Sequence, residues 1–254
     1  MIFAINRLKE ILGINNNQIR VKTSKEQNPK KKNNKPKALK PSVIKPRAVR
    51  NTLKKYGQLF YSIGSSGFDS ATTWLIKSLI PASSFGVFFG PSSSLKSFLA
   101  IDICCHISTG KTWGNQRVNK GAVVYVAAEG KSGASKRIKA WEIANQTKVD
   151  QLYVLGESVM LADDENQTTL ILSIQNIEKE HNEKVNLIVI DTLARCYSGD
   201  ENTTRDMTKF ISGCDNIRST IDSALLCIHH SGRDESRGGR GSSALLAACD
   251  YEFK

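Results

Sequence analysis

The chain has 254 residues, 40% of them hydrophobic, and a formal net charge of +12 at pH 7. This length allows one large domain with an appendage, or two small domains, and the apolar fraction is sufficient for a core. The six cysteines form no C-x-x-C pair and lie mostly in apolar runs. They therefore predict buried thiols in a reducing compartment and argue against a disulfide or zinc framework.

No apolar run approaches the length of a membrane span. The charged residues Arg7, Lys9 and Glu10 stand where a signal peptide needs its hydrophobic region. We therefore expect a cytoplasmic protein with no membrane contact. The Lys- and Asn-rich start leaves an organellar transit peptide as the alternative.

The positive charge is concentrated at the start of the chain. Residues 1–55 hold sixteen Lys or Arg against two acids, Glu10 and Glu26, whereas the remainder carries a net charge of −2. Residues 15–50 also contain four prolines and few apolar side chains, which predicts disorder. We interpret residues 1–67 as a basic, largely disordered segment, either a nucleic-acid-binding arm or a solvated linker. Residues 68–254 are then the folded domain.

Within residues 68–254, apolar runs alternate with helical patterns. Residues 72–80 read as a short helix or strand. Buried strands are predicted at 85–89, 121–128, 152–155, 185–190 and 224–228, and helices at 98–107, 136–144, 168–181 and 203–220. Polar loops are predicted at 196–202 and 231–241, and an apolar segment follows. This alternation predicts an α/β fold, a mainly parallel sheet flanked by helices and joined by right-handed crossovers.

A small-residue loop lies between the first apolar run and the first helix, the context of a phosphate-binding P-loop. Its residues are Gly90, Pro91, Ser92, Ser93, Ser94, Leu95, Lys96 and Ser97. Backbone N–H groups of such a loop bind phosphate, with the Lys on the terminal phosphates and the Ser hydroxyl on Mg²⁺. Leu95 replaces the second Gly of the motif, and we expect it to take a negative φ without strain. The alternative is a Ser-rich turn that caps a buried helix.

Three more predicted strands end in side chains that can bind a metal or transfer a proton, namely Glu129, Asp191 and the pair His229 and His230. Ligands of parallel sheets bind at the carboxyl ends of the strands. Asp191 follows an apolar run, as a Mg²⁺-binding Walker B carboxylate does, and Thr192 follows it rather than Glu. The base for the attacking water is then expected to be Glu129. The alternatives are helix-capping or helix-terminal roles for both carboxylates, and structural roles for the histidines.

These motifs together resemble the RecA-like ATPases of the RepA hexameric replicative helicase type. The residues that carry the resemblance are GPSSSLKSFLAIDICCHISTG, VVYVAAEG, LIVIDTLAR and HHSGRDESRGGRGSSAL. The resemblance implies a RecA-like P-loop fold that binds ATP and Mg²⁺ and assembles as a homohexamer. We expect single-stranded DNA as a partner, bound non-specifically because the lysines of the basic segment offer charge without a fixed geometry for reading bases. The resemblance also implies Lys96 and Ser97 at the phosphates and metal, Glu129 as catalytic carboxylate, Asp191 as metal ligand and His230 as sensor.

The chain departs from that family in several places. The loop has one Gly, and Asp250 occupies the region of an Arg that reaches the neighbouring subunit's nucleotide, with Arg233, Arg237 and Arg240 as possible substitutes. The chain also stops in an expected sheet strand, so a C-terminal truncation is expected. The resemblance implies ATP hydrolysis coupled to DNA replication by a helicase or helicase-like motor. The alternatives are an ATP-binding replication regulator or loader with little hydrolysis, and an inactive truncated remnant.

Overall fold

The computed structural model describes residues 20–21, 54–56, 59–65, 72–230 and 242–254. The chain divides into two compact units, one of residues 1–22 with 74–254 and one of residues 23–73. In the second unit, strands β2 (Lys54–Tyr56) and β3 (Leu59–Tyr61) form an antiparallel pair. Most of the basic segment and the loop with Arg233, Arg237 and Arg240 lie outside the described residues, so both predictions stay open.

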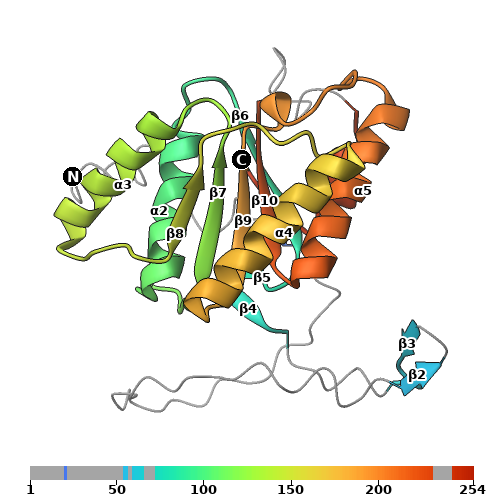
Figure 1. The fold of residues 1–254 in the computed structure, drawn as a ribbon, viewed down its shortest axis with the longest axis horizontal. Coiled ribbons are helices and arrows are strands. Elements are labelled where there is room, and N and C mark those ends of the chain that lie inside the picture. Colours follow the sequence, from blue (N-terminus) through green and yellow to red (C-terminus); the bar gives the residue numbers. More distant parts are fainter. Residues whose placement is uncertain (1–19, 22–53, 57–58, 66–71, 231–241) are drawn as a thin grey trace. The chain divides into compact units, whose positions relative to one another are not determined.

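The larger unit is built on a seven-stranded sheet of order β1-β11-β6-β10-β9-β7-β8. Every neighbouring pair is parallel except β1 with β11. The strands are β1 (Arg20–Val21), β6 (Phe85–Gly90), β7 (Ala122–Ala127), β8 (Leu152–Leu155), β9 (Val185–Asp191), β10 (Ala224–His230) and β11 (Tyr251–Phe253). The carboxyl ends of the parallel strands therefore share one edge, as Figure 1 shows. The predicted α/β fold with a mainly parallel sheet is confirmed.

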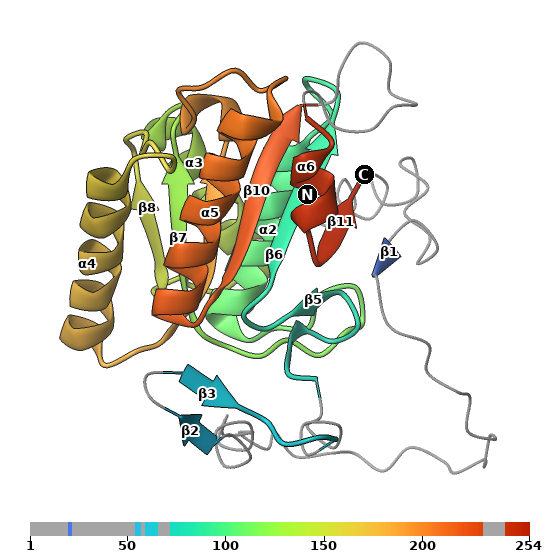
Figure 2. The ribbon, with the colours of Figure 1, turned by 90° about the vertical axis from the view of Figure 1, so that its right-hand side faces the viewer.

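Helices cover both faces of this sheet (Figures 1 and 2). One face packs against α2 and α3, and the other against α4 and α5, so the fold has three layers. The helices are α2 (Lys96–Thr109), α3 (Lys131–Asn145), α4 (Asp164–His181), α5 (Thr204–Ile221) and the short α6 (Ala244–Ala248). A 3₁₀ turn, η3 (Leu193–Arg195), follows β9.

The sequence located β6 to β10 and α2 to α5 but placed some boundaries wrongly. It did not predict the short helix α6, nor β1, which lies in the segment expected to be disordered. Helix α3 begins at Lys131 rather than residue 136. Its first turn is polar and follows Gly130, so the pattern of apolar residues did not predict this turn as helical. Helix α4 begins at Asp164, where the Asp163 side chain accepts a hydrogen bond from the Asn166 amide. The expected single short helix or strand at residues 72–80 is instead part of a pair of short strands. Strand β4 (Trp74–Ile76) pairs antiparallel with β5 (Ile80–Pro81).

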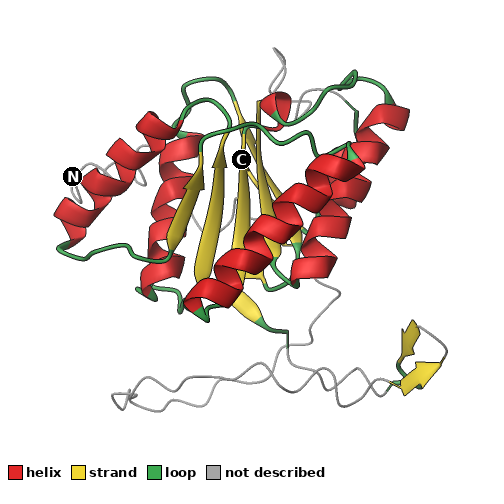
Figure 3. Cartoon of the chain, viewed as in Figure 1, coloured by secondary structure: helices red, strands yellow, loops and turns green. Residues whose placement is uncertain are grey.

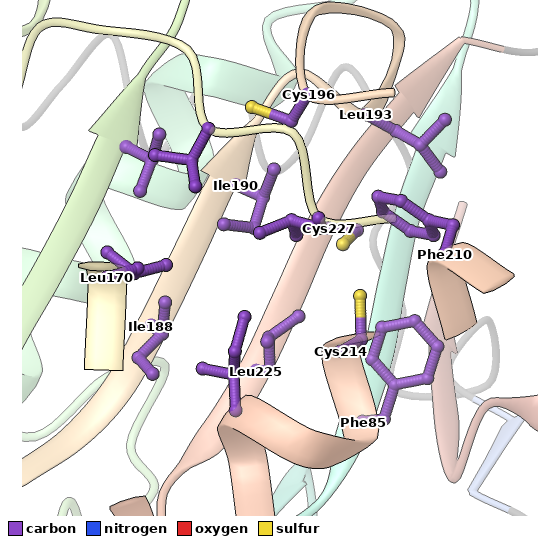
Figure 4. Close-up of a cluster of buried hydrophobic side chains, with 14 of the residues drawn as sticks. Phe85, Leu170, Ile188, Ile190, Leu193, Cys196, Phe210, Cys214, Leu225 and Cys227 are labelled. Atoms are coloured by element: carbon purple, nitrogen blue, oxygen red, sulfur yellow. The ribbon is translucent and has the colours of Figure 1, made fainter. Parts of the chain in front are cut away.

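The core lies on both sides of the central strands, which is why those strands read as continuous apolar runs. Figure 3 shows these strands as a central sheet with helices around it. Figure 4 shows the side that faces α4 and α5, where Cys214 of α5 and Cys227 of β10 lie among Phe85, Leu225 and Phe210. All six cysteines are buried free thiols. The predicted buried thiols are therefore confirmed.

The end of the chain adds the last parallel strand, β11, beside β6. The Tyr251 ring lies over Gly86, where a Cβ would come within 2.2 Å of the ring. Asp250 Oδ2 accepts a hydrogen bond from the Phe85 N–H at 2.8 Å. Asp250 therefore fixes the start of β6, at the opposite end of this strand from Gly90. The expected final sheet strand is confirmed.

Candidate active site

The loop between β6 and α2 has the strand-loop-helix geometry of a phosphate-binding site. Strand β6 ends at Gly90 and α2 begins at Lys96. The first N–H groups of a helix have no partner within it, and they carry the positive end of its dipole. Because α2 starts directly after the loop, these donors and the loop lie together at the sheet edge.

The Lys96 side chain is folded against its own loop. Its Nζ donates hydrogen bonds to the backbone oxygens of Gly90 at 2.9 Å and Pro91 at 2.6 Å, and to Ser94 Oγ at 3.3 Å. Burial lowers the pKa of this ammonium group, while the negative charges of Asp191 and Glu129 raise it. The site thus holds a desolvated cation within the field of two carboxylates.

Leu95 is not in the expected conformation. Its φ is 66° and its ψ is 16°, which is the left-handed region, so the prediction of a negative φ is wrong. The motif places Gly at this position, and the backbone here requires the conformation that Gly adopts without a steric penalty. Leu95 therefore keeps the backbone shape of the loop at a conformational cost.

Replacing Leu95 with Gly should stabilise the fold. A non-Gly residue in the left-handed region costs about 1 kcal/mol, which Gly avoids. We expect the free energy of unfolding of Leu95→Gly to exceed that of Leu95→Ala by about this amount, measured by urea unfolding. Leu95→Ala is the control because it removes the same side chain but keeps the Cβ. Equal stabilities of the two variants would contradict a strained position.

Asp191 ends strand β9 with one carboxylate oxygen bound and the other not. Its Oδ2 accepts a hydrogen bond from the Tyr125 hydroxyl at 2.5 Å. Its Oδ1 is buried and makes no hydrogen bond with the residues that the structure describes. Burial raises the pKa of this carboxyl group, whereas the nearby hydroxyls of Tyr125 and Ser97 and the charge of Arg137 lower it.

Asp191→Asn should raise the melting temperature of the metal-free protein. A raised pKa means that ionised Asp191 destabilises the fold at neutral pH, and this cost disappears as the pH falls through that pKa. Asn removes the charge and keeps an oxygen that can accept the Tyr125 hydrogen bond. Thermal unfolding at pH 7 with a chelator checks this, with the exposed Glu157→Gln as control. A lower melting temperature for Asp191→Asn would show that the charge is compensated.

Glu129 lies just after strand β7, beside Asp191. The Thr192 hydroxyl donates a hydrogen bond to Glu129 Oε1 at 3.2 Å. Ala127 is the register partner of Asp191, and the Ala128 N–H donates to the Asp191 backbone oxygen at 2.8 Å. The parallel pairing of β7 and β9 thus places the two predicted carboxylates together.

A cavity of about 270 Å³ opens beside these groups. It is lined by Ser97, Tyr125, Ala127, Glu129, Gly130, Ser132, Gly133, Ala134, Arg137 and Asp191. The lining includes the first turn of α3, whose N–H groups favour anions. Lys96 and His230 do not line this cavity, so the sequence-predicted site residues lie around the loop rather than in one pocket.

The two histidines at the end of β10 differ in burial. His229 is fully buried, whereas His230 is partly exposed. His230 is the register partner of Gly90, the first residue of the loop, and His229 is the partner of Phe89. Neighbouring residues on a strand point to opposite faces. His230 therefore shares its sheet face with Ile228, on the side of α2.

The structure adds three residues that the sequence patterns did not single out, namely Tyr125, Thr192 and Arg137. The guanidinium of Arg137 lies 4.6 Å from the centre of the Phe98 ring and lowers the pKa of Asp191. Arg137 lies eight residues after Glu129, on a helix whose exposed positions are largely basic or polar. No local signal separates it from a solvated residue.

A buried carboxylate holds α3 against α2. Asp102 of α2 accepts hydrogen bonds from the indole N–H groups of Trp113, at 2.8 Å, and Trp141, at 3.0 Å. Trp141 lies one turn after Arg137 on α3. The hydrogen bond from Trp141 to Asp102 therefore helps to hold the part of α3 that carries Arg137 against α2.

The described residues fit the groups that a P-loop site requires. Mg²⁺ prefers oxygen ligands, and the unpartnered Asp191 Oδ1 and the Ser97 hydroxyl supply them at one cavity. The start of α2 and Lys96 supply donors and positive charge for phosphates. Helices long and apolar enough to cross a membrane are absent from the described part of the chain.

A family model described as an AAA domain matches residues 61–236, which is more than half of the chain. No curated protein matches the sequence. The matched range contains the loop at Gly90, both carboxylates and the two histidines. Its AAA description agrees with the P-loop geometry of the site. The chain therefore belongs to the AAA domain family of P-loop ATPases.

Proposed function

We propose that this chain binds ATP and Mg²⁺ at the loop from Gly90 to Ser97 and hydrolyses the terminal phosphate, with Glu129 acting on water. One observation carries the proposal. Lys96, Glu129 and Asp191 lie at or just after the carboxyl ends of β6, β7 and β9, which share one edge of the sheet. A phosphate-binding cation, a metal-binding carboxylate and a base are the groups that phosphoryl transfer to water requires.

Each residue has a distinct task in this proposal. Lys96 and the first N–H groups of α2 bind the phosphates and stabilise the charge that develops on them. Ser97 and Asp191 hold Mg²⁺, which neutralises negative charge on the terminal phosphates when bound. Glu129 orients the attacking water and accepts its proton. His230 senses the terminal phosphate from the strand beside Gly90.

Arg137 is a further phosphate-binding candidate. It lines the cavity next to Asp191 and is held by stacking on Phe98 rather than by an ion pair in the described part of the chain. Arg137 and the first N–H groups of α3 supply positive charge in a cavity that Glu129 and Asp191 also line. Its charge would thus add to that of Lys96.

The cellular role that we propose is a cytoplasmic replication motor, a helicase or a helicase-like ATPase that works as a homo-oligomer on single-stranded DNA. The resemblance to the RepA type supports this role. The basic segment supports DNA contact, because each phosphate that it neutralises releases counterions. Lysines in a Pro- and Asn-rich segment read charge rather than sequence, so binding would be non-specific.

Steady-state ATP turnover with and without single-stranded DNA, beside a nucleotide-binding assay, tests the proposal. Turnover that DNA stimulates supports a motor. Binding with little turnover supports a replication regulator or loader. Neither binding nor turnover supports an inactive remnant.

The DNA part is tested by salt dependence. About six phosphate contacts would give a slope of roughly −4 for log K against log salt on a single strand. A variant in which an uncharged linker of equal length replaces residues 23–53 should lose most of this slope and keep ATP binding, because it retains strand β1 of the sheet and no loop residue lies before Gly90. The same slope in both proteins would place DNA contact on the ATPase domain.

A further inference from the structure

One carboxylate lies just after strand β7 and another at the end of strand β9, and each accepts a hydrogen bond from a hydroxyl of the other segment. Tyr125 of β7 donates to Asp191 of β9 at 2.5 Å. Thr192, just after β9, donates to Glu129, just after β7, at 3.2 Å. The two hydrogen bonds thus cross between the same pair of strands in opposite directions.

The pairing of the strands explains why each hydroxyl reaches its partner. Ala127 is the register partner of Asp191, so Tyr125 lies two residues earlier on the same face. The Tyr ring spans that offset within the core, where Tyr125 is 1% exposed. Thr192 is 2% exposed. Both donors are therefore fixed by packing.

The Tyr125 bond decides which oxygen of Asp191 remains for the metal. A carboxylate that is bound through Oδ2 cannot rotate freely, so Oδ1 is directed away from the Tyr hydroxyl. Oδ1 has no hydrogen-bond partner among the described residues, and Ser97 lines the same cavity. Ser97 and Asp191 Oδ1 can then act together on one cation.

The Thr192 bond acts on a different property. Glu129 is an exposed side chain with several accessible rotamers. A hydrogen bond to Oε1 selects one of them and leaves the second oxygen to accept a proton from water. Positioning of a base within hydrogen-bond reach of the water is what determines its effect on the rate.

We propose that Tyr125 and Thr192 are positioning residues that brace the two carboxylates reciprocally, Tyr125 setting the affinity of the site for the metal and Thr192 setting the rate of water attack. This inference rests on the proposed function, because it assigns tasks within the same ATP site. The inference goes beyond the proposed function because it assigns metal affinity to one hydroxyl and the rate of water attack to the other.

The test measures the affinity of a non-hydrolysable ATP analogue with Mg²⁺ and with EDTA, and the single-turnover rate of ATP hydrolysis. Tyr125→Phe should lower the Mg²⁺-to-EDTA affinity ratio by about tenfold, the scale of one hydrogen bond to a charged group. Thr192→Val should keep that ratio and lower the single-turnover rate by about tenfold. Thr192→Ser should restore most of the rate.

Two control variants remove hydroxyls elsewhere. Tyr197→Phe deletes a hydroxyl that donates to the Asp200 backbone oxygen at 3.1 Å, and Thr220→Val changes an exposed helix position. Both should match the wild type in affinity ratio and rate. A loss of stability alone would lower the affinities with Mg²⁺ and with EDTA together and leave their ratio unchanged.

The outcomes separate this inference from the proposed function. If the wild type binds no nucleotide, the proposed function fails and this inference fails with it. If the wild type binds and hydrolyses ATP but Tyr125→Phe keeps the wild-type ratio, or Thr192→Val keeps the wild-type rate, the reciprocal brace alone is wrong. If Tyr125→Phe does not fold, the rates of Thr192→Val and Thr192→Ser still decide, because the brace requires both hydroxyls.

Discussion

Lys96→Ala should lower the affinity for ATP by about two orders of magnitude or more. A triphosphate that leaves water needs compensating charge, and a charge-assisted hydrogen bond is about twice as strong as a neutral one. Lys96 also holds the loop, because its Nζ bonds to the backbone oxygens of Gly90 and Pro91. Alanine removes both the charge and these bonds. Calorimetric titration with ATP and Mg²⁺ measures the loss.

Lys209→Ala is the matched control for that experiment. Lys209 is an exposed lysine of α5, so its removal changes the net charge by the same amount without touching the loop. We expect wild-type affinity in this variant. If Lys96→Ala also kept the wild-type affinity, residues 90–97 would be only a helix-capping turn, and ATP binding at this loop would have to be abandoned.

The sequence was sufficient for the fold because the central strands are buried on both faces. Strand β9 reads as an apolar run that ends at a charge, a pattern typical of a buried parallel strand. The rule that parallel strands share their carboxyl edge then brings Glu129 and Asp191 together without knowledge of the strand order. The structure adds that β7 and β9 are direct neighbours.

The side chains that orient these carboxylates could not be predicted in the same way. Tyr125 reads as one more apolar residue of a buried strand, and its contact with Asp191 depends on the register of β7 against β9. Thr192 stands out in the sequence only because it follows Asp191 where a Glu could stand. Both roles come from pairing between segments more than sixty residues apart. A single sequence carries no local signal for such a register.

The conformation of Leu95 shows the limit of reasoning from residue type. Leucine disfavours a positive φ, so the local sequence favours the negative value that we expected. The end of β6 and the start of α2 are each fixed by packing in the core, and the short loop must join them. Tertiary structure therefore decides the backbone at this position against the preference of the side chain.

Glu129→Gln should keep the affinity for ATP and lower the turnover by about two orders of magnitude or more, the scale of a general base. Glutamine has almost the same shape and can still accept the Thr192 hydrogen bond through its amide oxygen, so the site should keep its geometry. What it cannot do is accept a proton from water. Nucleotide affinity and single-turnover hydrolysis, measured on the same protein, separate the two effects.

Glu157→Gln provides the control, because Glu157 is an exposed carboxylate just after strand β8, at the same sheet edge, and does not line the cavity. Its turnover should equal that of the wild type. Glu129 differs from Glu157 in its hydrogen bond from Thr192 and in its interaction with the charge of Lys96.

If Glu129→Gln turned over ATP as fast as the wild type, Glu129 would have no part in water attack. The remaining groups able to accept a proton beside the loop would then be Asp191, whose buried Oδ1 has no hydrogen-bond partner among the described residues, and His230, the register partner of Gly90.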